Sequence, residues 1–223
     1  MNRRSRIFLG SLCFLSASLS ADAFTLIANS GKPARWSNGT TSYRFNTATS
    51  GYFVGGVDAS GTSSDEFQPI RNAFNSWLSV PGLSLSVTEN TASSQSASSS
   101  DHINTIQWVK TGWRSLSFQP TSRALAVTLL SFDSGSGVIT DADIYFNADN
   151  FRWAVVDSGT ETSYIDVQNI ATHEIGHFLG IDHSSENINE DDPALSDATM
   201  FFASTGGETS RRTLHADDEL AIR

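Results

Sequence analysis

The chain has 223 residues, a formal net charge of −10 and a single cysteine, Cys13. This length suits one domain with a sizeable core. An acidic surface repels phosphate backbones, which argues against nucleic acid as a partner. The longest apolar run is shorter than the ~18 residues that span a bilayer, so we expect no membrane anchor.

The first 23 residues have the order of a secretory signal peptide. Three arginines precede a mostly apolar run over residues 7–19, and Ala21-Asp22-Ala23 fits the small-x-small cleavage pattern. We therefore expect residues 1–23 to be removed and residues 24–223 to be exported, either outside the cell or to a periplasm. The alternative interpretation is a buried N-terminal helix.

Removal of this leader would change the chemistry of the remaining chain. It would take away Cys13, three arginines and one aspartate, which moves the net charge from −10 to −12. The remaining chain would have no disulfide. An exported protein of this kind depends on its core or on a bound metal for stability.

The first predicted elements are a strand and a helix separated by a polar loop. Tyr43 and Phe45 alternate within residues 41–46, which indicates a short strand. The helix is expected to begin at Ser63, which forms a capping-box pattern with Glu66, and to end before Pro81-Gly82.

Four further segments are predicted strands, because β-forming apolar residues concentrate or alternate in them. They are residues 83–89, 104–110, 124–132 and 137–147. A helix is expected to begin near Ser163, and a short helix within "HADDELAIR" closes the chain. We find no repeat and no second domain boundary.

The segment "ATHEIGHFLGIDH" contains three of the five histidines, at positions 173, 177 and 183. His173 and His177 are four residues apart, so a helix places them on one face, where both can hold one metal ion. Glu174 lies one step round the helix, within reach of a water bound to that metal.

His183 can join the other two histidines only if the helix ends soon after His177. A continuous helix would rise about 15 Å between His173 and His183, whereas zinc–nitrogen bonds are about 2.0–2.1 Å long. Gly180 lies where the chain must turn, and glycine accepts the positive φ of a helix C-terminus. Three imidazoles suit one zinc ion and leave a position for water, which is the catalytic arrangement.

The sequence "HEIGHFLGIDH" matches H-E-x-x-H-x-x-G-x-x-H, and the chain therefore resembles the metzincin metallopeptidases. Within that group it is similar to bacterial-type secreted members of the matrixin family, and weaker likeness extends over most of residues 24–223. The resemblance implies an α+β, zincin-like catalytic domain with a twisted five-stranded mixed sheet and about three helices.

The resemblance also implies a role for each site residue. His173, His177 and His183 would bind the catalytic zinc, Glu174 would be the general base, and Met200 would lie in a turn beneath the metal. The implied activity is that of a secreted zinc endopeptidase that cleaves protein or peptide substrates, with a zinc-bound water activated by Glu174. We expect the protein to be a monomer.

Substrate binding is expected along the strand that corresponds to the family's edge strand, residues 124–132. Small side chains on one face of this strand would let an extended peptide approach the backbone. The pocket beside the zinc would be walled by the segment after Met200. The expected substrate-binding residues are Ala124, Ala126, Thr128, Phe201 and Phe202.

Two other functions remain open, and so does a second kind of metal site. One is a zinc-dependent binding or adhesion module without catalysis, against which Glu174 argues. The other is a metallohydrolase acting on a non-peptide amide. Calcium is possible, with its ligands unassigned among seven acidic residues: Asp133, Asp141, Asp143, Asp149, Glu190, Asp191 and Asp192.

Overall fold

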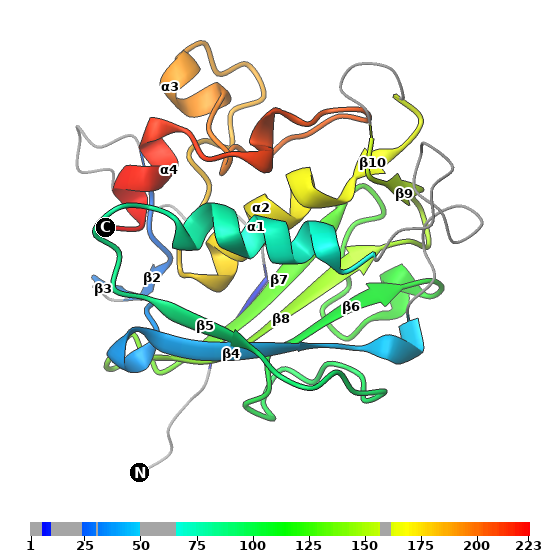
Figure 1. The fold of residues 1–223 in the computed structure, drawn as a ribbon, viewed down its shortest axis with the longest axis horizontal. Coiled ribbons are helices and arrows are strands. Elements are labelled where there is room, and N and C mark those ends of the chain that lie inside the picture. The colour runs from blue at the N-terminus through cyan, green and yellow to red at the C-terminus, as the bar shows by residue number, and fades with distance from the viewer. Residues whose placement is uncertain (1–5, 10–23, 30, 50–65, 157–161) are drawn as a thin grey trace.

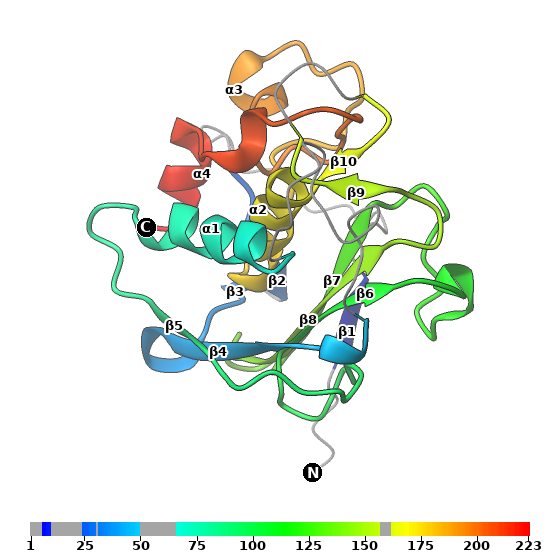
Figure 2. The ribbon, with the colours of Figure 1, turned by 45° about the vertical axis from the view of Figure 1, so that its right-hand side comes forward.

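The computed structural model describes residues 6–9, 24–29, 31–49, 66–156 and 162–223, and Figure 1 shows its arrangement. Two helices, α1 (Gln68–Leu78) and α2 (Val167–Phe178), cover one face of a mixed β-sheet. The view in Figure 2 shows the same layering from a second direction. The chain therefore has the α+β architecture that its sequence predicts.

The sheet has the strand order β1-β7-β8-β6-β4-β5. Strands β5, β4, β6 and β8 run parallel to one another, whereas β7 is antiparallel to β8. These five are the predicted strands, and β1 adds a sixth at the β7 edge. Their bounds are β1 Arg6–Leu9, β4 Thr40–Phe45, β5 Ser86–Glu89, β6 Thr105–Val109, β7 Ala126–Phe132 and β8 Ile139–Asn147.

Smaller elements surround the sheet. The sequence did not predict two small sheets whose strands have two residues each, because such short segments show no periodicity. They are β2 (Ala28–Asn29) with β3 (Lys32–Pro33), and β9 (Trp153–Ala154) with β10 (Ile165–Asp166). The chain ends with two short helices, α3 (Pro193–Ser196) and α4 (Ala216–Ala221). No helix among the described residues is long and apolar enough to cross a membrane.

Both long helices begin later than the sequence predicts. Helix α1 begins at Gln68, and its N-cap Phe67 makes no side-chain capping bond; Ser63 lies outside the described residues. Pro69 fits this start because a first-turn proline lacks only an N–H that has no partner within the helix. The expected start of α2 near Ser163 is wrong, because Ile165 and Asp166 form β10 first.

The main core lies between the helices and the sheet. The Phe74 ring of α1 stacks on Tyr43 of β4 at 4.2 Å between centroids and meets Phe178 of α2 edge-on at 5.6 Å. Trp77 Nε1 donates a 2.8 Å hydrogen bond to the Thr172 carbonyl, so α1 is joined directly to α2. These contacts hold α2 against the sheet with eleven of its twelve residues buried.

A second apolar cluster covers the opposite face of the sheet. Trp113, fully buried, packs there with Val127, Leu129 and Tyr145. Alternation along β7 therefore assigns Val127 and Leu129 to this cluster and Ala126, Leu130 and Phe132 to the helix side. Helix α2, which carries the histidines, faces the side on which Ala126, Leu130 and Phe132 lie.

Candidate metal centre

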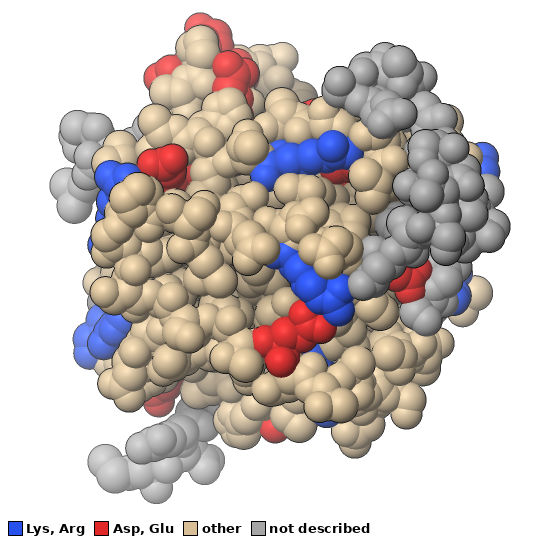
Figure 3. All heavy atoms as spheres, in the orientation of Figure 1, with Lys and Arg blue, Asp and Glu red and all other residues tan. Residues whose placement is uncertain are grey.

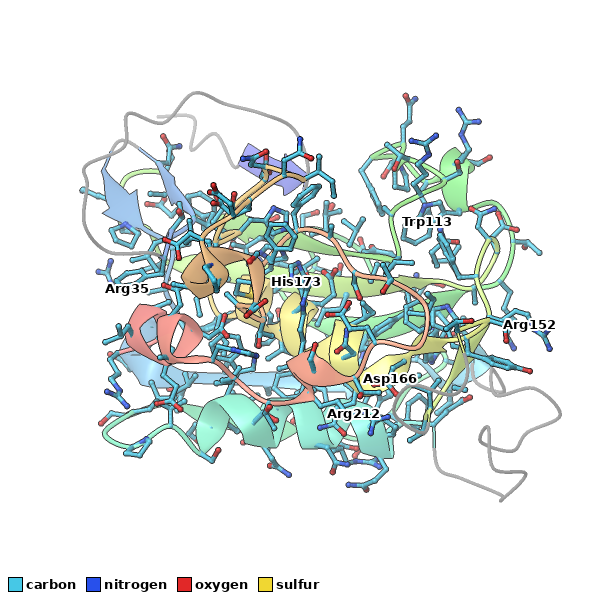
Figure 4. The ribbon with its side chains drawn as sticks, turned by 90° about the horizontal axis from the view of Figure 1, so that it is seen from above. Arg35, Trp113, Arg152, Asp166, His173 and Arg212 are labelled. Carbon is cyan, nitrogen blue, oxygen red and sulfur yellow. The ribbon has the colours of Figure 1, made fainter. Side chains whose placement is uncertain are left out.

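Helix α2 places His173 and His177 on one face. Its N-terminus is capped by Asp166, whose side chain accepts a hydrogen bond from the Asn169 N–H at 2.8 Å. Both histidines are buried, with exposures of 9 % and 6 %. Figure 4 shows His173 in the middle of the molecule, with Asp166 at the far end of the same helix.

The chain turns back directly after α2 and brings His183 to the other two histidines. Gly180 has φ of 98°, and a β-carbon there would collide with the Ala34 carbonyl. The three ligand nitrogens lie within 4.8 Å of one another, and His177 Nε2 is 3.1 Å from His183 Nε2. Two nitrogens bound tetrahedrally to one zinc are separated by about 3.3 Å, given bonds of about 2.0–2.1 Å.

In each of the three imidazoles, a hydrogen bond at Nδ1 fixes which ring nitrogen can bind a metal. Nδ1 of His173 donates to the Thr199 carbonyl at 2.8 Å, and Nδ1 of His177 donates to the Ile181 carbonyl at 2.8 Å. His183 Nδ1 lies 3.2 Å from Glu186 Oε1. Because Nδ1 carries the proton in each case, Nε2 keeps the lone pair that a metal needs.

The electrostatic surroundings also favour neutral imidazoles. Burial lowers the pKa of His173 well below its ordinary value, and the charges of His177 and His183 lower it further. Burial is likewise the largest cause that lowers the pKa of His177 and of His183. Three neutral nitrogen donors with no fourth protein ligand in the described cluster fit a catalytic zinc ion.

Glu174 lies beside the histidines with 5 % of its surface exposed. Burial raises the pKa of its carboxyl group, whereas the neighbouring His177 and hydrogen bonds from Thr128 lower it. The hydroxyl of Thr128 lies 2.6 Å from Glu174 Oε2, a contact that the sequence did not predict because it joins two elements 46 residues apart.

Met200, which the resemblance assigns to a turn beneath the metal, packs against the histidine helix α2. It is 1 % exposed, and a β-carbon added to Gly176 of α2 would collide with its sulfur. The backbone N–H groups of Thr199 and Met200 donate to the two carboxylate oxygens of Asp218, at 2.9 and 3.1 Å. Asp218 of α4 thus holds the turn that carries both Met200 and the carbonyl that orients His173.

A cleft of about 370 Å³ opens beside the three histidines. The expected substrate-binding residues all line it: Ala124, Ala126, Thr128, Phe201 and Phe202. Phe202 is partly exposed, and its ring lies 6.3 Å from that of His183, whereas Phe201 is buried. Arg211 also lines the cleft and donates a hydrogen bond to the Phe201 carbonyl at 2.8 Å. Arg211 was not among the site residues that the sequence predicts.

Two buried aspartates lie on the opposite face of the sheet, away from the cleft. Burial, reinforced by the charge of Asp141, raises the pKa of Asp143 to about 8. Burial also raises the pKa of Asp141 to about 6. Asp141 Oδ2 accepts the His102 N–H at 2.7 Å, and Asp143 Oδ1 accepts the Thr105 N–H at 2.9 Å.

The other acidic residues considered for calcium serve local turns and caps. Asp133 Oδ1 accepts the Ser136 N–H at 2.8 Å, and Asp149 accepts the Trp113 N–H at 3.0 Å. Asp192 caps α3, and Glu190 accepts the Ser185 hydroxyl. Acidic side chains gather over α3 at the top of Figure 3. Asp191, two residues before α3, is exposed to solvent. Calcium ligands therefore remain unassigned.

The α+β fold, the three Nε2 donors and the adjacent buried carboxylate define this protein as a zinc metallopeptidase. The matrixin family model matches residues 35–223. The chain belongs to the matrixin family of zinc metalloendopeptidases, and the three-histidine cluster is its metal site. A comparison with curated proteins finds no match.

Proposed function

We propose that this matrixin is a bacterial-type secreted endopeptidase that cleaves extended segments of proteins, with Glu174 as the general base. The observation that carries the proposal is the placement of Glu174, buried beside three convergent imidazoles at the wall of one cleft. Binding of a metal alone requires the histidines and gives no reason to bury a carboxylate there.

The chain's own residues would hold the metal and move one proton. Nε2 of each of His173, His177 and His183 would hold the zinc ion. When bound, zinc would polarise the scissile carbonyl and make an attacking water more acidic. Glu174 would accept the proton of that water on Oε1 and deliver it to the leaving amine nitrogen, which balances the hydrolysis.

We further propose that substrate lies along β7, as an added strand. Two features support this. Residues 126–128 of β7 pair with β8 on one side, and Ala126 and Thr128 line the cleft. The next part of β7, Leu129–Phe132, pairs with β1, which belongs to the proposed leader. Removal of the leader would remove β1 and leave this part of β7 open to substrate as well.

The proposal includes export and a single working subunit. Residues 1–23 would be the signal peptide, and residues 24–223 the catalytic domain. All three metal-binding histidines and Glu174 come from one chain, which supports a monomer as the active unit. N-terminal sequencing of the exported protein tests the cleavage site, and sedimentation analysis tests the monomer.

The decisive experiment is cleavage of an unfolded protein by the purified chain 24–223, followed by sequencing of the new termini. We expect internal cleavage that stops with a zinc chelator and returns with added zinc. Cleavage of a non-peptide amide alone would instead support the second candidate, a metallohydrolase. Stoichiometric zinc binding without any cleavage would support an adhesion module.

A further inference from the structure

The carboxylate of Glu174 has a close neighbour on the strand that faces it. Thr128 Oγ1 lies 2.6 Å from Glu174 Oε2 and 3.0 Å from the Glu174 carbonyl oxygen. Thr128 comes from β7 and Glu174 from α2, and both side chains are buried, at 4 % and 5 % exposure. The contact therefore joins the proposed substrate strand β7 to the histidine-bearing helix α2 inside the protein.

A hydroxyl group carries one hydrogen and can donate it to one acceptor at a time. The 2.6 Å separation falls in the range of a charge-assisted O–H···O⁻ bond, which is stronger than a bond to a neutral carbonyl. In the ionised form that a general base requires, the carboxylate is therefore the preferred acceptor. This bond engages Oε2 and leaves Oε1 as the oxygen that takes a proton.

We propose that Thr128 is a positioning residue for the peptidase reaction, holding Glu174 in one orientation with Oε1 directed to the attacking water. The inference rests on the proposed role of Glu174 as general base. The proton passes from water to Oε1 and then to the leaving nitrogen, while the Thr128 bond to Oε2 persists throughout. Thr128 itself neither gains nor loses a proton.

Preorganisation of this kind acts on the chemical step. A carboxylate with a free terminal torsion would lose contact with the water for part of the time, which lowers kcat. Substrate would pair with the main chain of β7, which a side-chain substitution at Thr128 keeps, so KM should change little. A role confined to packing between β7 and α2 would instead change stability and leave turnover intact.

The test compares Thr128→Val, which keeps the shape and removes the hydroxyl, with Thr128→Ser, which keeps the hydroxyl. We expect the valine variant to lose about tenfold to hundredfold in kcat, the range that a hydrogen bond to a charged group represents. The serine variant should recover most of that loss. Zinc content should stay at one ion per chain in both variants.

A crystal structure supplies a readout other than activity. In Thr128→Val with zinc bound, the Glu174 carboxylate should occupy more than one orientation, and in Thr128→Ser a single one. If the valine variant does not fold, Thr128→Ala compared with Thr128→Ser makes the same comparison.

A double variant separates this inference from the function on which it rests. If Thr128 acts through Glu174, then adding Thr128→Val to Glu174→Gln should not lower the residual kcat further. A further fall would overturn the positioning role, and so would native turnover in Thr128→Val. Native turnover in Glu174→Gln would overturn the role of Glu174 itself.

Discussion

At the scale of single residues, two buried carboxyl groups lie in different surroundings. Glu174 is buried beside the imidazoles in the cleft, whereas Asp143 is buried on the far face of the sheet. The first is the proposed general base of the reaction. The second affects the stability of the fold.

Replacement of Glu174 by glutamine should abolish most turnover and preserve the protein otherwise. The amide cannot accept a proton, and general-base contributions are about 10²–10⁴-fold. We expect kcat to fall by about 10²–10⁴-fold or more. Zinc content and melting temperature should stay near those of the native chain. A peptide cleavage assay with zinc analysis checks this. Native-rate cleavage by Glu174→Gln would exclude the proposed mechanism.

The raised pKa of Asp143, about 8, predicts that stability falls as pH rises. Between about pH 4 and pH 8 the unfolded chain releases this proton while the folded chain keeps it, so deprotonation favours unfolding. Asp143→Asn mimics the neutral acid and removes this loss. Each unit of pKa difference corresponds to about 1.4 kcal/mol, with part of the effect shared with Asp141.

Urea unfolding at a series of pH values measures the effect of Asp143→Asn. The variant should be more stable than the native chain at pH 8, and the difference should shrink toward pH 4. Asp191→Asn, at an exposed position, serves as the control and should follow the native curve. Parallel curves for Asp143→Asn and the native chain would show that Asp143 is ionised in the fold at neutral pH.

At the scale of elements, α2 is fixed at both ends. Its N-cap Asp166 accepts hydrogen bonds from Arg212 Nε at 2.9 Å and Nη2 at 2.5 Å, and Figure 4 shows the two residues side by side. At the other end, Gly180 reverses the chain toward His183. The turn that ends α2 at Gly180 therefore sets the distance between His173 and His183.

Gly180→Ala should weaken both folding and zinc binding. A positive φ costs an alanine about 1–2 kcal/mol, and here the added carbon would also collide with the Ala34 carbonyl. Gly112→Ala is a matched control, because Gly112 has φ of 74° and open space around it. Denaturant unfolding and zinc titration of both variants measure the difference. Equal losses in the two variants would mean that the turn at Gly180 can shift without moving His183.

At the scale of the whole molecule, bound zinc should stabilise the fold. The three ligands meet only in the folded chain, so zinc binds the folded state preferentially. Each tenfold rise in free zinc above its Kd should add about 1.4 kcal/mol. Residues 24–223 contain no cysteine, so no disulfide replaces this contribution.

Thermal unfolding with and without a zinc-selective chelator tests this stabilisation. We expect the melting temperature to fall on chelation and to recover with zinc. His183→Ala should melt at nearly the same temperature under both conditions. Recovery with calcium in place of zinc would show that the stabilising ion is a different one. A chelator that leaves the native melting temperature unchanged would contradict the prediction.

The sequence by itself determined the elements and the identity of the metal ligands. Apolar alternation predicted the five strands β4 to β8, because side chains on a strand alternate between faces. Helical spacing placed His173 and His177 on one face, and the reach of a zinc–nitrogen bond required a turn near Gly180. These inferences depend only on local geometry, and local geometry follows from the order of residues in the sequence.

Only the tertiary structure decided the contacts between distant segments. Thr128 bonds Glu174 across 46 residues, Asp218 holds the turn of Met200, and Arg211 lines the cleft. It also decided where α2 begins, because Ile165 and Asp166 pair with β9 before the helix starts. None of these features has a periodic pattern, since each depends on how separate elements pack, and packing is a property of the folded chain.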